Sequence, residues 1–234
     1  MTISTQILER IKYYGGYPQT SVSLSQMVKF GQNLDPITLL KGTKFVHREL
    51  PVRLAHRVVE LENLPHNLSA MPSIQTVKRW YTESFKDLME LPEYNLDSSF
   101  ELEKSKYFTE RPENLPMPEG ALEYIQTITK TIELIKKRHD PTQMTIAQGI
   151  IELKDYRSKS GKCVMDMEER LPESIQAFLD RFYLSRIGIR MLIGQHVALT
   201  RSHFDPSSVP KDYVGIICTK TNIGQIGSFY IYLL

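Results

Sequence analysis

The chain has 234 residues, of which 41% are hydrophobic and 24% charged, a balance typical of a folded globular protein. A formal net charge of +2 excludes the strongly basic surface of a nucleic-acid-binding protein, and no apolar run is long enough to span a bilayer. Two cysteines without a CxxC spacing exclude a disulfide scaffold and a structural zinc site.

Residues 1–20 are expected to form an N-terminal segment of their own. Its apolar side chains recur at helical spacing, which predicts a short amphipathic helix packed on the rest of the chain (Ile3, Ile7, Leu8 and Ile11). A mitochondrial targeting helix is the alternative, but such a helix would be more basic and would lack an acid such as Glu9.

Three helices are predicted next. Ser23–Lys29 has the pattern of a short helix and Thr43–Leu64 that of a long one. Pro51 lies inside the long one and predicts either a kink or a helix that begins there. A third helix is expected to begin at Pro72, because proline is tolerated in a first turn. Residues 92–119 are rich in proline and charge and are predicted to form a long exposed loop.

Two further helical segments complete the pattern. The first carries an inward stripe at steps of three and four residues, and Pro141 is expected to interrupt it (Ile125, Ile128, Ile132, Ile135 and His139). The last long helix is predicted to begin near Pro172. Four long amphipathic helices favour an all-α fold, an antiparallel four-helix bundle with short N-terminal helices. The strand-like run VGIIC follows within residues 211–222, with no partner strand in the pattern.

The sequence carries no recognisable catalytic motif. Glu-x-x-His and His-Glu-x-x-His metal motifs, the nucleophile elbow and the glycine-rich phosphate loops are all absent from these 234 residues. We therefore predict no metal ligand and no catalytic residue.

What remains is a set of polar groups on inward faces. Arg186 and Arg190 lie one helical turn apart, and like charges at this spacing repel each other. The pair indicates either partner carboxylates or a bound anion. Together with His139 it would suit a small carboxylate, which arginine binds through paired hydrogen bonds.

Five runs of the chain resemble the mitochondrial pyruvate dehydrogenase kinase family, which includes the branched-chain ketoacid dehydrogenase kinases. They are RELPVRLAHR (48–57), PSIQTVKRWY (72–81), MTIAQGI (144–150), FLDRFYLSRIGIRMLIGQH (178–196) and DYVGIICT (212–219). MTIAQG and the run at 178–196 favour the pyruvate dehydrogenase branch, whereas LAHR and DYVGIICT are also similar to the branched-chain enzyme.

The resemblance implies a regulatory four-helix-bundle domain over residues 21–203. The start of a GHKL-type ATP-binding domain would follow over residues 204–234, truncated after residue 222 and ending in an atypical tail. Family members are protein-serine kinases of the mitochondrial matrix that phosphorylate the E1α subunit and dock on the lipoyl domain of the E2 core. ATP and Mg²⁺ belong to the catalytic domain of the full-length family. Because that domain's motifs are missing from this sequence, we expect no cofactor here and no phosphoryl transfer by this chain alone.

The resemblance also implies two binding sites. A keto acid effector, pyruvate or dichloroacetate, is expected among Leu54, Tyr81, Ser84, Ile135, His139, Ser185, Arg186, Ile189, Arg190 and Ile193. Lys136 departs from the family, whose members often carry arginine there. The lipoyl-docking slot is expected at Val22, Met27, Phe30 and Phe45, of which Val22 and Met27 replace bulkier residues. Two alternatives remain open, a naturally short non-catalytic isoform that binds E2 and a branched-chain ketoacid dehydrogenase kinase homologue.

Overall fold

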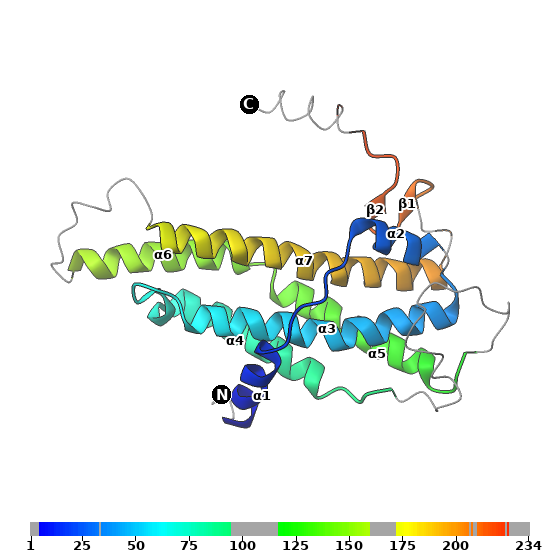
Figure 1. The fold of residues 1–234 in the computed structure, drawn as a ribbon, viewed down its shortest axis with the longest axis horizontal. Helices are drawn as coiled ribbons and strands as arrows, with labels where there is room; N and C mark the ends of the chain where they lie inside the picture. Colours follow the sequence, from blue (N-terminus) through cyan, green and yellow to red (C-terminus); the bar gives the residue numbers. More distant parts are fainter. Residues whose placement is uncertain are drawn as a thin grey trace.

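The computed structural model describes residues 5–32, 34–94, 117–159, 172–205, 207, 210–222 and 224, so most of the predicted loop at 92–119 and the tail at 225–234 lie outside it. The described chain is mostly helical with one small antiparallel sheet, which confirms the helical class (Figure 1). Its elements are α1 (Thr5–Gly15), α2 (Leu24–Gln32), α3 (Pro36–Glu62), the 3₁₀ helix η1 (Leu68–Ala70), α4 (Pro72–Met89), α5 (Ala121–Arg138), α6 (Thr142–Lys159), α7 (Glu173–Phe204), β1 (Tyr213–Val214) and β2 (Ile217–Cys218).

The long helix α3 begins earlier than its apolar pattern predicts. Asp35 Oδ1 accepts a hydrogen bond from the Thr38 N–H at 2.6 Å, and Pro36 occupies the first turn. The helix then continues through the buried Pro51, so the prediction of a helix that begins at Pro51 is wrong. Proline removes one backbone hydrogen bond, and burial of Leu50 and Leu54 on either side holds the helix together across that gap.

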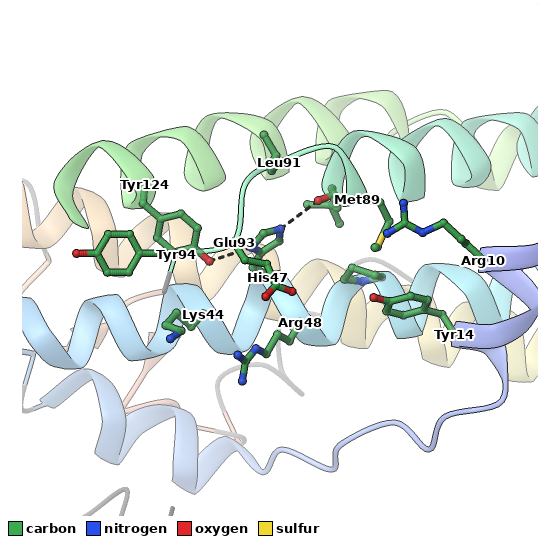
Figure 2. A pocket seen from close by; sticks show the side chains of 12 residues that line it. Arg10, Tyr14, Lys44, His47, Arg48, Met89, Leu91, Glu93, Tyr94 and Tyr124 are labelled. Carbon is green, nitrogen blue, oxygen red and sulfur yellow. Dashed lines mark hydrogen bonds between the residues drawn. The ribbon is translucent and has the colours of Figure 1, made fainter. Parts of the chain in front are cut away.

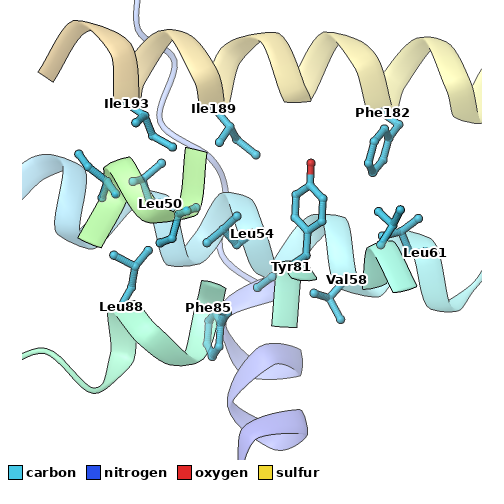
Figure 3. Close-up of a cluster of buried hydrophobic side chains, with 14 of the residues drawn as sticks. Leu50, Leu54, Val58, Leu61, Tyr81, Phe85, Leu88, Phe182, Ile189 and Ile193 are labelled. Atoms are coloured by element: carbon cyan, nitrogen blue, oxygen red, sulfur yellow. The ribbon is translucent and has the colours of Figure 1, made fainter. Parts of the chain in front are cut away.

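Contacts among the long helices build one hydrophobic core. α3 packs against α1, α4, α5 and α7, while α4 also contacts α6 and α7 also contacts α5. The core side chains of α3 face those of α4 and α7 in Figure 3. Leucines of α3 and aromatic residues of α4 and α7 dominate this cluster, and each of them is at most 1% exposed (Leu50, Leu54, Leu61, Tyr81, Phe85 and Phe182).

Pro141 separates α5 from α6, as the sequence predicts. The backbone N–H of His139 still donates to the Ile135 carbonyl at 3.1 Å, and α6 begins at Thr142. α6 then packs on α4, whereas α5 packs on α7 and α3 as well as on α4. The interruption therefore lets the second half of the apolar pattern leave α3 and α7 while both halves keep contact with α4, and it leaves His139 at the junction.

The strand-like run after residue 211 forms a hairpin with itself. β1 and β2 pair antiparallel, with Tyr213 opposite Cys218, and Gly215 adopts a left-handed φ of 61° at the turn. The prediction of an isolated strand is therefore wrong, because glycine lets the chain reverse within the run. The side-chain amide of Gln195 on α7 holds this turn. Its Oε1 accepts from the Ile216 N–H at 2.9 Å, and its Nε2 donates to the Val214 carbonyl at 3.2 Å.

α2 packs against the hairpin and α7. A Cβ atom at Gly31 would lie 2.5 Å from Val214 Cγ1 and 2.8 Å from Leu199 Cδ2, so only glycine allows this approach to β1 and α7. Figure 1 shows α2 beside the hairpin. Within the described ranges, none of the helices combines the length and hydropathy that a membrane span requires.

Candidate functional site

All ten residues predicted for the effector pocket are described, and they come from four helices. Leu54 lies on α3, Tyr81 and Ser84 on α4, Ile135 on α5 with His139 directly after it, and the other five on α7 (Ser185, Arg186, Ile189, Arg190 and Ile193). The apolar members and Tyr81 are at most 2% exposed. The junction between α5 and α6 thus faces the middle of α4 and α7.

Tyr81 and His139 form the aromatic part of this cluster. Their rings stack with centroids 4.2 Å apart and planes inclined by 22°. The hydroxyl of Tyr81 points toward α7, between Ile189 and Phe182 (Figure 3). Burial raises the pKa of Tyr81 to about 12, although the charge of Arg186 and its hydrogen bond with the hydroxyl favour the ionised form. Tyr81 is therefore a neutral hydrogen-bonding group at physiological pH.

Ser84 connects the ring of His139 to the guanidinium of Arg138. Its hydroxyl donates to the Trp80 carbonyl at 2.7 Å and accepts from Arg138 Nη1 at 2.8 Å. His139 Nε2 lies 3.0 Å from Ser84 Oγ and 3.4 Å from the Trp80 carbonyl. Because that carbonyl can only accept, the assignment that satisfies these contacts places the proton of His139 on Nε2.

Burial keeps the His139 ring neutral. Loss of hydration, together with the charges of Arg186, Arg138 and Arg190, lowers the pKa of His139 to about 4, although the hydrogen bond to the Trp80 carbonyl opposes the shift. The cations of the cluster are thus its arginines, and the imidazole acts as a neutral donor at physiological pH.

The two arginines of α7 have unequal partners. Arg190 Nη1 donates to Asp140 Oδ1 at 2.7 Å, whereas Arg186 Nη2 makes a long contact of 3.4 Å with the Asp140 carbonyl. Arg186 has no carboxylate partner among the described residues. Ser185 Oγ is also buried there without a hydrogen-bond partner in the described part of the chain. The donors of Arg186 that no carboxylate occupies are the ones that a bound oxyanion would pair with.

The residues predicted for lipoyl docking are all partly exposed. Val22 precedes α2, Met27 and Phe30 lie on α2, and Phe45 lies on α3. The Phe30 ring packs on Gly42, where a Cβ atom would lie 2.6 Å from its Cζ. Phe45 follows one turn after Gly42, so the structure brings Phe30 close to the α3 turn that carries Phe45.

A separate cavity of about 220 Å³ lies between α1, α3 and the segment after α4 (Figure 2). Its floor is the buried His47, whose Nδ1 lies 2.8 Å from the Tyr124 hydroxyl and whose Nε2 lies 3.0 Å from the Leu88 carbonyl. Nε2 therefore carries the proton and Nδ1 accepts one from Tyr124. Both side chains are satisfied, so we assign this histidine a structural role.

Sequence reasoning missed four side chains near these sites. Arg138 and Asp140 flank His139, and the alternation of charge and histidine at the end of the predicted stripe was a signal for them. Arg57 influences the titration of Tyr81 and lies one turn beyond Leu54 on α3. Leu24 is an apolar side chain, 57% exposed, on the same helix α2 as Phe30. Lys136, the departure from the family, lies elsewhere and lines a cavity beside Gly215 and Ile216.

No metal centre is present within the described ranges, where no three His, Cys, Asp or Glu side chains gather as metal ligands would. The class that the fold defines is a helical domain with a partly buried cluster of arginine, histidine, tyrosine and serine between its helices, followed by a short hairpin. Residues 21–218 match the family described as mitochondrial branched-chain alpha-ketoacid dehydrogenase kinase. The chain belongs to this family.

Individual relatives carry the name of the pyruvate dehydrogenase branch. The mitochondrial pyruvate dehydrogenase (acetyl-transferring) kinase of Schizosaccharomyces pombe is 33% identical over 261 residues, covering 93% of this chain and 56% of the relative. The Arabidopsis thaliana kinase of the same name is 37% identical over 92% of this chain and 48% of its own length. Human isozyme 3 is 31% identical over 93% of this chain and 45% of the isozyme. The chain thus spans about half the length of these relatives.

Proposed function

We propose that this chain is the regulatory part of a mitochondrial pyruvate dehydrogenase kinase, a four-helix bundle that senses a small keto acid and docks on the E2 lipoyl domain. The names of the relatives support the pyruvate dehydrogenase branch over the branched-chain one and support a location in the mitochondrial matrix. The whole kinase would phosphorylate E1α, and its bundle would be residues 21–203.

One observation carries the effector part of the proposal. Arg186 and Arg190 both contact Asp140, which directly follows the neutral His139 and is the only carboxylate bonded to the arginine pair among the described residues. A small carboxylate would accept hydrogen bonds from Arg186 and Ser185, while Ile189 and Leu54 would contact its carbon atoms. Burial strengthens such charge-assisted hydrogen bonds.

The cofactors of the family do not fit this part of the molecule. The described residues offer neither a cluster of metal ligands nor a phosphate-binding loop. We therefore propose that ATP and Mg²⁺ are bound in the family by residues other than these, and we derive no step of phosphoryl transfer here.

The effector site is tested by thermal unfolding with dichloroacetate. Binding to the folded state alone raises the melting temperature by mass action, so the unmodified chain should be stabilised. Arg186→Ala should abolish that shift. Arg201→Ala is the matched control, because Arg201 lies on the same helix with its side chain 71% exposed. An equal shift in Arg186→Ala and the unmodified chain would reject the site.

The docking slot is tested by calorimetry with an isolated E2 lipoyl domain. Phe30→Ala should weaken binding at least tenfold, since aromatic anchors dominate small interfaces. Leu184→Ala removes a 69% exposed apolar side chain from α7 and should leave the affinity unchanged. Equal losses in both variants would contradict a slot at α2.

A further inference from the structure

Another cavity shares no lining residue with the effector cluster. It has a volume of about 330 Å³ and lies between the end of α1, the last turns of α3 and the first turns of α7. Val59, Leu64, Pro65 and Phe178 supply apolar wall, and Arg57, Glu60 and Arg181 supply charge. We propose that this cavity binds a small organic monocarboxylate with an apolar body.

The charges in the cavity do not cancel. Arg57 Nη1 donates to Glu60 Oε2, and Arg181 Nε donates to the other oxygen of the same carboxylate at 3.3 Å. Two guanidinium groups therefore share one carboxylate. His56 donates from Nε2 to the Tyr17 carbonyl at 2.8 Å, and its ring adds no negative charge to the cavity. The cavity keeps one net positive charge.

Arg57 is the group whose hydrogen bonds are incomplete. Only 9% of Arg57 is exposed, and its Nε is buried without an acceptor among the described residues. Burial lowers the pKa of Arg57, and the Glu60 carboxylate opposes that shift. Buried cations are normally fully hydrogen-bonded, so this guanidinium has unused capacity for an oxyanion.

The net charge, the guanidinium groups and the volume of the cavity favour a monocarboxylate. A single negative charge matches the single excess positive charge, whereas a phosphate dianion would leave a net negative cavity. Arginine binds a planar carboxylate through two parallel hydrogen bonds. The volume equals that of about eleven water molecules, enough for a carboxylate with a short hydrocarbon chain against Phe178 and Leu64.

The test uses pentanoate as the probe, with 1-pentanol and inorganic phosphate for comparison, in calorimetric titrations of the full 234-residue chain. Pentanoate should bind and both comparison compounds should not. Arg181→Met should weaken pentanoate at least fivefold; that side chain is 63% exposed, so the variant keeps its fold. Glu60→Gln should tighten pentanoate, because it removes the competing carboxylate.

Two control variants distinguish binding in this cavity from binding elsewhere on the chain. Glu62→Gln makes the same change in net charge on α3 outside the cavity and should leave pentanoate binding unchanged. Arg186→Ala, which removes the proposed effector site, should also leave it unchanged. The proposal is overturned if pentanoate does not bind, if pentanol binds equally well, or if Arg186→Ala abolishes binding that Arg181→Met retains. Preferential binding of phosphate would overturn the carboxylate assignment as well.

Discussion

Arg190 and Asp140 are joined by an ion pair of 2.7 Å, while the neighbouring Arg186 contacts the backbone carbonyl of Asp140 and the Tyr81 hydroxyl but no carboxylate among the described residues. The sequence allows two interpretations of this cationic pair, partner carboxylates or a bound anion. The structure satisfies the first for Arg190 and leaves Arg186 available for the second.

Asp140→Asn should strengthen dichloroacetate binding, since Asp140 competes with an incoming carboxylate for the arginines. The side chain of Asp140 is 56% exposed, so solvent screens the pair and it is worth about 0.2–1 kcal/mol. The dissociation constant should therefore fall by up to about fivefold, as measured by calorimetry. Asp155→Asn on α6 makes the same charge change at an exposed position and should have no effect. Weaker binding in Asp140→Asn would mean that Asp140 orients the site rather than competing for it.

Ser185→Ala and Ser84→Ala should differ in their effect on the stability of the unliganded chain. Ser185 Oγ is buried without a partner among the described residues, so its removal should leave the unliganded chain as stable or slightly more stable. Ser84 bonds to Trp80, His139 and Arg138, so its removal should cost about 1–3 kcal/mol. Urea unfolding measures both. If Ser185 serves the effector, its alanine variant should lose dichloroacetate affinity despite normal stability, and unaltered affinity would exclude that role.

Stability should fall as the pH falls from about 6.5 to 4. Burial lowers the pKa of His139 and of His196 to about 4, whereas both rings titrate near 6.5 in an unfolded chain. In that interval the unfolded chain binds protons that the folded chain does not, so the free energy of unfolding decreases with each step of acidification. The loss is on the order of 3 kcal/mol for each ring, and it is complete below pH 4.

Urea midpoints at pH 7, 6, 5 and 4.5 measure this dependence. His196→Gln should reduce the slope by about half, because it removes one of the two titrating rings. His66→Gln is the matched control, since His66 is exposed and bonds only to the Ser174 hydroxyl. A slope that survives His196→Gln unchanged would show that other groups control the acid sensitivity.

Much of the helical pattern could be predicted from the sequence, because the apolar period and the prolines are local signals. The break at Pro141 and the beginning of α4 at Pro72 follow from the covalent geometry of proline. Pro51 has the same geometry, but tertiary burial overrides it and α3 runs through. The hairpin was missed because a two-residue strand leaves almost no alternation to detect, and Gly215 was its only turn signal.

The candidate site was predictable residue by residue only where the resemblance supplied it. The contacts that depend on helix packing could not be predicted, because no spacing in the sequence places Arg138 on Ser84 or Arg57 near Tyr81. Those contacts depend on how α4, α5 and α3 pack, which amphipathic patterns leave undetermined.

Gln195→Leu should detach the hairpin from α7. The variant loses two hydrogen bonds to the turn and keeps a side chain of similar size, so we expect a cost of about 1–3 kcal/mol. Amide hydrogen exchange at Ile216 should accelerate, since its N–H loses its acceptor. Gln176→Leu is the control at an exposed position of the same helix. Retained protection of Ile216 in Gln195→Leu would show that the strand pairing alone holds the turn.

The close approach of Gly31 to Val214 and Leu199 means that α2 and the hairpin both contact the C-terminal end of α7. Arg186 and Gln195 belong to one uninterrupted helix and lie about 13 Å apart along its axis. We expect a displacement of α7 at Arg186 to be transmitted to the hairpin and to α2, because both contact the last turns of the same helix. A ligand at Arg186 and a partner on α2 would then each alter the binding of the other.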